Sequence, residues 1–199
     1  MNNSLVPEIK DYRDLLLKQT TFLDVRAPIE FASGAIPGSI NVPLLYNDER
    51  RQVGTRYRQN GRKAAIELGT ELIKGNLREK RIKAWADLLQ EKPKAVICCA
   101  RGGLRSEITQ QWLAEKNIFC PRVAGGHKAI RNYLLRFLMD LCASGSFTIL
   151  SGMTGTGKTS LIKQFDNAVD LEGAANHKGS SFGRPIDEQP SQIDFENCI

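Results

Sequence analysis

The stretch AVICCARGGLRS, residues 95–106, joins a short apolar run to a polar, glycine-rich turn. The apolar run predicts a buried β-strand that ends at Cys98 and Cys99. A helix is expected to begin near Leu104, so the turn follows the carboxyl end of a strand and precedes the N-terminus of a helix. Ligands of parallel α/β sheets bind at this end of the strands. The stretch therefore predicts a strand–turn–helix unit with a site in its turn.

The residue types in this turn favour a reactive cysteine that faces an anion. Cysteine reacts as its thiolate, which is favoured at a helix N-terminus and beside arginine side chains. Cys99 is expected to have both neighbours, in a loop of spacing C-x5-R. Successive backbone N–H groups of a glycine-rich turn can form a nest for an anion, and Ser106 is expected to cap the helix or donate a hydrogen bond. The predicted anion-binding loop comprises Arg101, Gly102, Gly103, Arg105 and Ser106.

A second interpretation makes the cysteine pair part of the core, because free cysteine is commonly buried. This interpretation suits Cys98, whose side chain should point away from that of Cys99 along a strand. The chain has five cysteines, two histidines and no C-x-x-C spacing. We therefore expect free thiols in a reducing cytoplasm, no structural metal site, and structural or incidental roles for Cys120, Cys142 and Cys198.

Short apolar strands and amphipathic helices alternate along most of the chain. Strands are expected at residues 21–27, 40–42, 94–99 and near 120–124. Helices are expected around Ile9–Leu16, at residues 104–117 and from 127 to Gly145, while a polar helical region with breaks at Gly54, Gly61 and Gly75 fills residues 44–90. This order predicts an α/β fold with a largely parallel sheet.

A second unit is expected after Gly145. Its sequence GMTGTGKT, residues 152–159, fits the phosphate-binding pattern G-x-x-x-x-G-K-[ST]. An apolar strand is expected before this loop, a helix after it and a second short strand at residues 167–173. The predicted phosphate-binding residues are Gly152, Gly155, Gly157, Lys158 and Thr159, with Mg²⁺ as a possible companion. Asp170 and Glu172 either contact the metal or are ordinary solvated carboxylates, and the sequence favours neither strongly.

The net charge of +6 is concentrated in one segment. Residues 50–83 contain eleven Lys and Arg against three Glu, whereas the rest of the chain sums to −2. Basic residues interleaved with tyrosine suit phosphate contacts and base stacking in RNA, although a charge run is also typical of a solvated helix face. The RNA-binding candidates are Arg50, Arg51, Arg56, Arg58 and Arg62. No apolar run is long enough for a membrane helix, and the N-terminus does not read as a secretory signal.

The sequence LDVRAPIEFASGAIPGSINVP, with the later cysteine loop and VAGG, resembles a rhodanese domain. The resemblance covers roughly residues 10–143 and is interrupted by the basic insert. Rhodanese domains carry sulfur as a cysteine persulfide. Many have His where Ala35 stands, and most sulfur-transferring members have a shorter loop than C-x5-R. The longer loop is similar to that of dual-specificity phosphatases of the same fold, which keeps phosphatase or arsenate reductase chemistry as an alternative.

The combination of DVRAPIEF, NDERRQVGT, CCARGGLRS, GMTGTGKT and VDLEGAANHKGSSFG resembles the bacterial tRNA 2-selenouridine synthases. This resemblance implies exchange of sulfur for selenium in wobble 2-thiouridine, with selenophosphate as donor and an S-geranyl intermediate made from geranyl diphosphate. It implies that Cys99 is essential, that Lys158 and Thr159 grip a phosphate or diphosphate, and that the insert seats the anticodon arm of tRNA. His177, Lys178 and Arg184 are further candidates for a phosphate contact.

The expected fold is a rhodanese-like domain at residues 1–143, with a helical insert at about 44–90, followed at 146–199 by the start of a P-loop α/β domain. Chains of the resembling family continue further, so we expect an incomplete C-terminal unit and doubt full synthase activity from this chain alone. No tightly bound cofactor is expected, and a selenophosphate-supplying enzyme is a candidate partner. The alternatives are a sulfurtransferase, an oxyanion reductase or phosphatase, and a non-catalytic tRNA-binding fragment.

Overall fold

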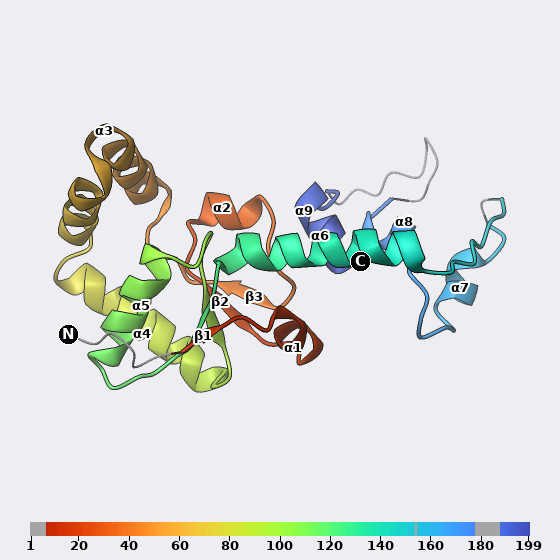
Figure 1. The fold of residues 1–199 in the computed structure, drawn as a ribbon, viewed down its shortest axis with the longest axis horizontal. Helices are drawn as coiled ribbons and strands as arrows, with labels where there is room; N and C mark the ends of the chain where they lie inside the picture. The colour runs from red at the N-terminus through yellow and green to blue at the C-terminus, as the bar shows by residue number, and fades with distance from the viewer. Residues whose placement is uncertain (1–6, 154, 178–187) are drawn as a thin grey trace. The chain divides into compact units, whose positions relative to one another are not determined.

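The computed structural model describes residues 7–153, 155–177 and 188–199, and they divide into two compact units, Met1–Arg131 and Asn132–Ile199 (Figure 1). The first unit contains a five-stranded, all-parallel sheet in the order β1-β5-β4-β2-β3. Its strands are β1 (Glu8–Ile9), β2 (Phe22–Asp24), β3 (Ser39–Asn41), β4 (Val96–Cys98) and β5 (Arg122–Val123). The predicted α/β class with a parallel sheet is confirmed.

Helices connect these strands in the first unit, and one more helix follows the last strand. They are α1 (Tyr12–Leu17), α2 (Pro28–Ala32), α3 (Asn47–Leu72), α4 (Asn76–Glu91), α5 (Leu104–Ala114) and α6 (Gly126–Ser144), the last of which continues into the second unit. The predicted helix around Ile9–Leu16 is only partly right. Ile9 pairs with Val123 in β1, because the sheet edge offers its backbone hydrogen-bond partners that a helix end lacks.

The central strand β4 is buried along its whole length, as its uninterrupted apolar sequence predicts for a parallel sheet covered on both faces. Ile97 belongs to a buried cluster that Trp85 of α4 and Leu113 of α5 complete. The indole N–H of Trp85 donates to the carbonyl of Val42 at 2.9 Å, so burying this side chain leaves no unpaired donor. This core fixes the carboxyl end of β4, where the cysteine pair lies.

The basic insert consists of α3 and α4, which confirms its predicted helical character. Helix α3 passes through Gly54 without a break but is kinked at Gly61, whose φ of 79° and ψ of −174° are not helical. Only glycine adopts this conformation at low cost. The two arms of α3 meet beyond the kink, since a Cβ atom on Gly69 would lie 3.7 Å from Val53.

The second unit has short helices, α7 (Lys158–Ile162), α8 (Leu171–Ala174) and α9 (Gln192–Cys198). The strands expected before the phosphate loop and at residues 167–173 are not formed in the described part of this unit. A strand needs a neighbour for its backbone hydrogen bonds, and none of the described segments here provides one. Large apolar side chains accordingly remain exposed, among them Phe147, Ile149, Phe165 and Leu171.

No helix in the described ranges combines the length and the apolar character that crossing a bilayer requires.

Candidate functional site

Cys99 directly follows the carboxyl end of β4. The carboxyl end of β2 lies beside it, because Asp24 and Cys98 are register partners. The residue is 3% exposed and packs in the core cluster with Val25 and Leu44. Residues 100–103 then form an irregular turn that leads into α5. The candidate site is therefore a buried thiol between the end of a strand and the start of a helix.

Two glycines allow this turn to pack directly against the turn between β5 and α6. Gly102 and Gly126 both have positive φ, at 61° and 59°. A Cβ atom on Gly126 would lie 2.1 Å from the carbonyl oxygen of Cys99 and 2.4 Å from the amide nitrogen of Gly102. The glycines of CARGG and VAGG are thus required for contact of backbone with backbone, a role that the sequence did not reveal.

Hydrogen bonds fix the same contact. The N–H of His127 donates to the carbonyl of Cys99 at 2.8 Å, and the N–H of Lys128 donates to that of Ala100 at 3.1 Å. Arg122 donates to the carbonyl of Gly102 at 3.4 Å and forms ion pairs with Glu8 and Glu107. The position of the cysteine loop is therefore set by β5 and α6 as well as by β4.

Arg105, the arginine that closes the C-x5-R loop, is paired with a carboxylate that sequence analysis missed. Its guanidinium binds both oxygens of Glu30, at 2.6 and 3.2 Å. Both side chains are mostly buried, with 21% and 18% of their surfaces exposed. A signal existed in the sequence, since Glu30 follows β2 and the carboxyl ends of neighbouring parallel strands share one edge of the sheet.

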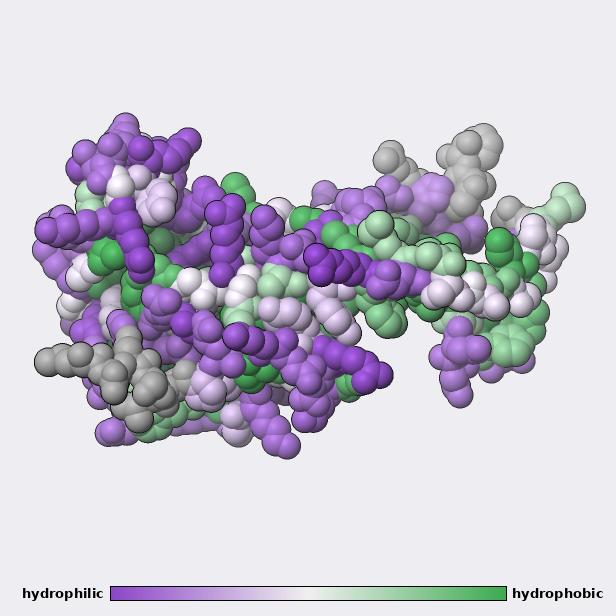
Figure 2. Space-filling model, in the orientation of Figure 1, coloured by the Kyte–Doolittle hydropathy of each residue, from purple (hydrophilic) through white to green (hydrophobic). Residues whose placement is uncertain are grey.

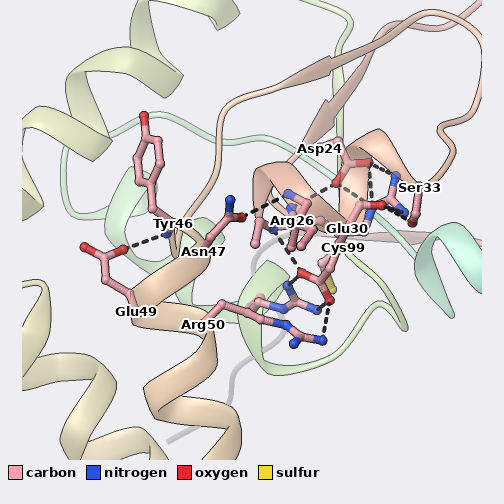
Figure 3. A network of polar contacts seen from close by, with 12 residues as sticks. Asp24, Arg26, Glu30, Ser33, Tyr46, Asn47, Glu49, Arg50 and Cys99 are labelled. Carbon is pink, nitrogen blue, oxygen red and sulfur yellow. Dashed lines mark hydrogen bonds and ion pairs between the residues drawn. The ribbon is translucent and has the colours of Figure 1, made fainter. Parts of the chain in front are cut away.

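Glu30 also contacts the basic insert. The Arg50 guanidinium of α3 lies 3.5 Å from the same carboxylate, and the backbone N–H of Ala27 donates to it at 3.0 Å. Figure 3 shows the side chains of Glu30 and Arg50 within this group of polar contacts. The structure thus brings the cysteine loop and one arginine of the insert together at a single acidic residue.

The charges in this network act on one another. Burial alone would raise the pKa of Glu30, but the hydrogen bonds and charge of Arg105 outweigh it and hold that pKa below its usual value. Burial would likewise lower the pKa of Arg105, but Glu30 and, to a smaller extent, the charge of the Cys99 thiolate raise it. Arg105 and Glu30 therefore each favour the charged form of the other.

Replacing Glu30 by Gln is expected to lower the free energy of unfolding by about 1–3 kcal/mol at neutral pH, because a buried charged pair loses one partner. A carboxyl with a lowered pKa contributes stability above its usual value of 4.5, and the contribution disappears as the pH falls through the folded value. The difference between wild type and Glu30→Gln should therefore shrink below pH 4.5. Urea unfolding across this range measures it, and a constant difference would contradict the assignment.

A second buried ion pair lies at the carboxyl end of β2. Arg26 binds Asp24 at 2.7 Å, and both side chains are at most 4% exposed. Arg26 also donates to the carbonyls of Glu30 and Gly34, at 3.2 and 3.0 Å. The DVR motif therefore anchors α2, the helix that carries Glu30.

The adjacent cysteines differ in their surroundings. Burial, together with the charges of Asp24 and Cys99, raises the pKa of Cys98 well above its usual value, which disfavours its thiolate. Burial also raises the pKa of Cys120 to about 12, and its thiol contacts the carbonyl of Ala95. Cys142 and Cys198 are exposed and lie in the second unit. Among the cysteines, Cys99 is the one that shares a loop with Arg105.

Family comparison now identifies the domain that holds this loop. The model described as "Rhodanese-like domain" matches residues 8–134. The chain belongs to the rhodanese-like family. A solved structure, the N-terminal domain of a protein described as ATP/GTP binding from Clostridium difficile 630, is 33% identical to this rhodanese-like chain. The match covers 65% of the chain and 99% of that structure, with a TM-score of 0.56.

The segment after the rhodanese-like domain also matches a family model. Residues 145–199 match "tRNA 2-selenouridine synthase AAA domain". The tRNA 2-selenouridine synthase of Pseudomonas fluorescens is 54% identical over 189 residues, which are 95% of this chain and 52% of that protein. That of Marinobacter nauticus is 50% identical over 97% of this chain and 53% of its own length. The expected resemblance is confirmed, and the chain spans about half the length of these relatives.

Within the rhodanese-like domain, Ser106 does not cap α5 as expected. Gly103 is the N-cap, and Ser106 lies three residues further on, inside the helix. Its hydroxyl is fully buried and has no hydrogen-bond partner among the residues that the structure describes. Donation by this hydroxyl to an anion in the cysteine loop stays a prediction.

Ser106→Ala is expected to keep the free energy of unfolding within about 0.5 kcal/mol, since the change removes a buried hydroxyl that makes no bond. Anion binding in the cysteine loop should weaken by about 10-fold if the hydroxyl donates to the ligand. Urea unfolding measures the first effect. The second is measured by how strongly added phosphate protects Cys99 from an alkylating reagent. A loss of stability with unchanged protection would assign Ser106 a structural role instead.

The candidate arginines of the insert differ in whether they contact the residues around the cysteine loop. Arg50 contacts Glu30, whereas Arg51 lies 3.2 Å from Asp48 on the exposed face of α3. Arg56, Arg58 and Arg62 are exposed along α3. Arg101, the other arginine of the cysteine loop, is also exposed. Only Arg50 of this set joins the cysteine loop network.

The phosphate-loop residues of the AAA segment lie in the second unit. Gly155 and Gly157 have positive φ, and the Lys158 ammonium donates to the carbonyls of Gly152 and Met153 at 2.8 and 2.9 Å. Thr159 is exposed in the first turn of α7.

Of the two acidic candidates of this segment, Asp170 has a role within its own helix. Asp170 caps α8 through the N–H of Gly173, and no group of three metal-ligand side chains occurs within the described ranges. The suggested contacts of Lys178 and Arg184 lie outside the described residues, whereas His177 lies just beyond α8.

Proposed function

We propose that this chain is the cysteine-bearing part of a tRNA-modifying transferase that replaces sulfur by selenium in wobble 2-thiouridine. One observation carries the proposal. The cysteine loop and the basic insert meet at Glu30, through Arg105 at 2.6 Å and Arg50 at 3.5 Å. An anion-binding cysteine loop physically joined to an RNA-binding helix suits a reaction on RNA better than one on a small free oxyanion.

The exchange needs neither an oxidant nor a reductant. Selenium in selenophosphate is already at the oxidation level of selenide, so it can take the place of sulfur on carbon 2 of the uridine without a redox step. The thiolate of Cys99 adds to carbon 2 of the S-geranyl nucleoside and expels geranyl thiolate, which takes up a proton. Selenium then displaces Cys99 from carbon 2, and water cleaves the P–Se bond to release phosphate. Arg105 and the Ser106 hydroxyl hold the phosphate end of the donor.

The AAA segment supplies the preceding step in this proposal. Geranyl diphosphate loses its diphosphate as the sulfur of 2-thiouridine bonds to the first carbon of the geranyl group. Lys158 and Thr159 would hold the departing diphosphate, and a Mg²⁺ bound there would offset its negative charge. Lys158 binds its own loop carbonyls, so it exchanges these two hydrogen bonds for the diphosphate oxygens.

Because Cys99 is buried, a substrate reaches it only after a movement of the residues around it. At 3% exposure, the thiol meets a nucleobase only when the Arg105–Glu30 pair or the turn at residues 100–103 moves. Binding of a tRNA phosphate to Arg50 would withdraw one cation from Glu30, so that RNA binding and opening of the loop are coupled. We place the reaction in the cytoplasm, with a selenophosphate-supplying enzyme as partner.

The test uses the purified chain with 2-thiouridine-containing tRNA, geranyl diphosphate and selenophosphate, followed by nucleoside analysis of the tRNA. Formation of 2-selenouridine supports the proposal, and S-geranyl-2-thiouridine should accumulate when selenophosphate is omitted. Turnover of thiosulfate, arsenate or an aryl phosphate without any effect on tRNA would instead favour a sulfurtransferase, reductase or phosphatase. Salt-dependent tRNA binding that supports none of these reactions would leave a non-catalytic RNA-binding fragment.

A further inference from the structure

The kink of α3 at Gly61 creates a groove that the site described above does not include. The groove has a volume of about 400 Å³. Its walls come from the arm before the kink and from Leu68 on the arm after it. The lining residues of the first arm are Arg51, Gln52, Thr55, Arg56 and Gln59.

The chemistry of this lining favours one class of ligand. It offers two guanidinium groups and three neutral hydrogen-bonding side chains around one apolar residue, and no carboxylate lines it. Outside this lining, the exposed carboxylate of Asp48 lies 3.2 Å from the guanidinium of Arg51. Figure 2 shows hydrophilic side chains gathered over α3. An anion with polar edges and one flat apolar face matches this arrangement.

The size of the groove selects further among anions. Cavities that hold a small organic ligand measure about 300–1,000 Å³, so a groove of this volume accepts more than an inorganic ion. Guanidinium groups bind phosphate through paired hydrogen bonds, and glutamine amides match the donor and acceptor pattern of a base edge. One nucleotide with its phosphate would satisfy both.

We infer that this groove, named here the α3 groove, binds a single unpaired nucleotide of an RNA strand. Arg51 and Arg56 hold its phosphate, Gln52 and Gln59 contact the base edge, and Leu68 covers the base or sugar face. Unpaired RNA nucleotides are recognised in this way, by contacts to exposed base edges. The inference rests on the proposed tRNA function and adds to it a defined contact outside the cysteine loop.

Two double variants of the full chain test the inference. Arg51→Ala/Arg56→Ala removes both cations of the α3 groove, and Arg58→Ala/Arg62→Ala removes the same charge from the same helix outside it. All four side chains are exposed, so both proteins should fold. Affinity for an unmodified anticodon stem-loop RNA is measured at several salt concentrations. The groove variant should bind at least 10-fold more weakly, and the comparison variant at most 3-fold more weakly.

A neutral variant separates base contacts from charge. Gln52→Ala/Gln59→Ala should weaken binding about 5-fold with an unchanged salt slope, whereas loss of a phosphate contact lowers the slope by about 0.7. Equal losses of affinity from the two arginine variants would contradict a nucleotide site in the α3 groove. So would displacement of the bound RNA by polyglutamate as effective as displacement by unlabelled RNA. Either result would leave diffuse charge as the basis of binding. RNA binding that neither arginine variant reduces would contradict the proposed role of the insert itself.

Discussion

Replacing Gly126 by alanine is expected to displace the cysteine loop and destabilise the whole first unit. The new Cβ atom would lie 2.1 Å from the carbonyl oxygen of Cys99 and 2.4 Å from the amide of Gly102. Both are backbone atoms, which cannot rotate away as a side chain would. The φ of 59° adds strain for any residue with a Cβ atom. The free energy of unfolding should fall by about 2–5 kcal/mol, and the reaction at Cys99 should be lost.

Urea unfolding of Gly126→Ala and of a matched Gly54→Ala variant measures this effect. Gly54 lies inside α3, where nothing lies within 4 Å of an added Cβ atom and φ is helical. Its replacement should raise stability by about 0.5–1 kcal/mol, as is usual for glycine in a helix. Equal stability of the two variants would show that the backbone contact between the two turns is not as close as described.

Replacing Cys99 by serine is expected to abolish formation of 2-selenouridine, with a loss of about 10³-fold or more. A serine hydroxyl stays protonated near neutral pH and is a much weaker nucleophile than a thiolate. The buried site should tolerate the change in size, so the protein should remain folded and still bind tRNA. Nucleoside analysis of tRNA and a binding measurement on the same sample separate chemistry from binding.

Cys98→Ala and Cys142→Ser serve as controls for this prediction. Cys98 is buried and its thiolate is disfavoured, and Cys142 is exposed in the second unit. Both variants should keep most of the activity, although Cys98→Ala should lose about 1 kcal/mol of stability through the small cavity it leaves. An active Cys99→Ser, or an inactive but folded Cys98→Ala, would move the nucleophile away from Cys99.

Local sequence was sufficient to predict the strand–turn–helix unit around Cys99. The apolar run of β4 and the amphipathic pattern of α5 are both periodic signals, and the kink at Gly61 was marked by its glycine. The sequence also indicated that Cys98 belongs to the core, but it did not indicate that Cys99 is buried there as well. These features depend on residues that are close together along the chain.

Features that depend on distant residues were missed. Glu30 is 75 residues from Arg105, and no local pattern shows that two such side chains will meet. The contact of Gly126 with the cysteine loop was hidden for the same reason. The strands expected around the phosphate loop were wrong in the described segments. Their apolar sequence favours a strand, but a strand also needs a neighbour to pair with.

The most direct test of the central claim is a mass measurement on the peptide that contains Cys99. The chain is first incubated with tRNA that carries S-geranyl-2-thiouridine. The proposed exchange predicts a nucleotide bound covalently to Cys99, absent from Cys99→Ser, which disappears as selenophosphate is added and 2-selenouridine forms. Conversion of the tRNA to 2-selenouridine with Cys99 unmodified throughout, or by Cys99→Ser at the wild-type rate, would contradict the account.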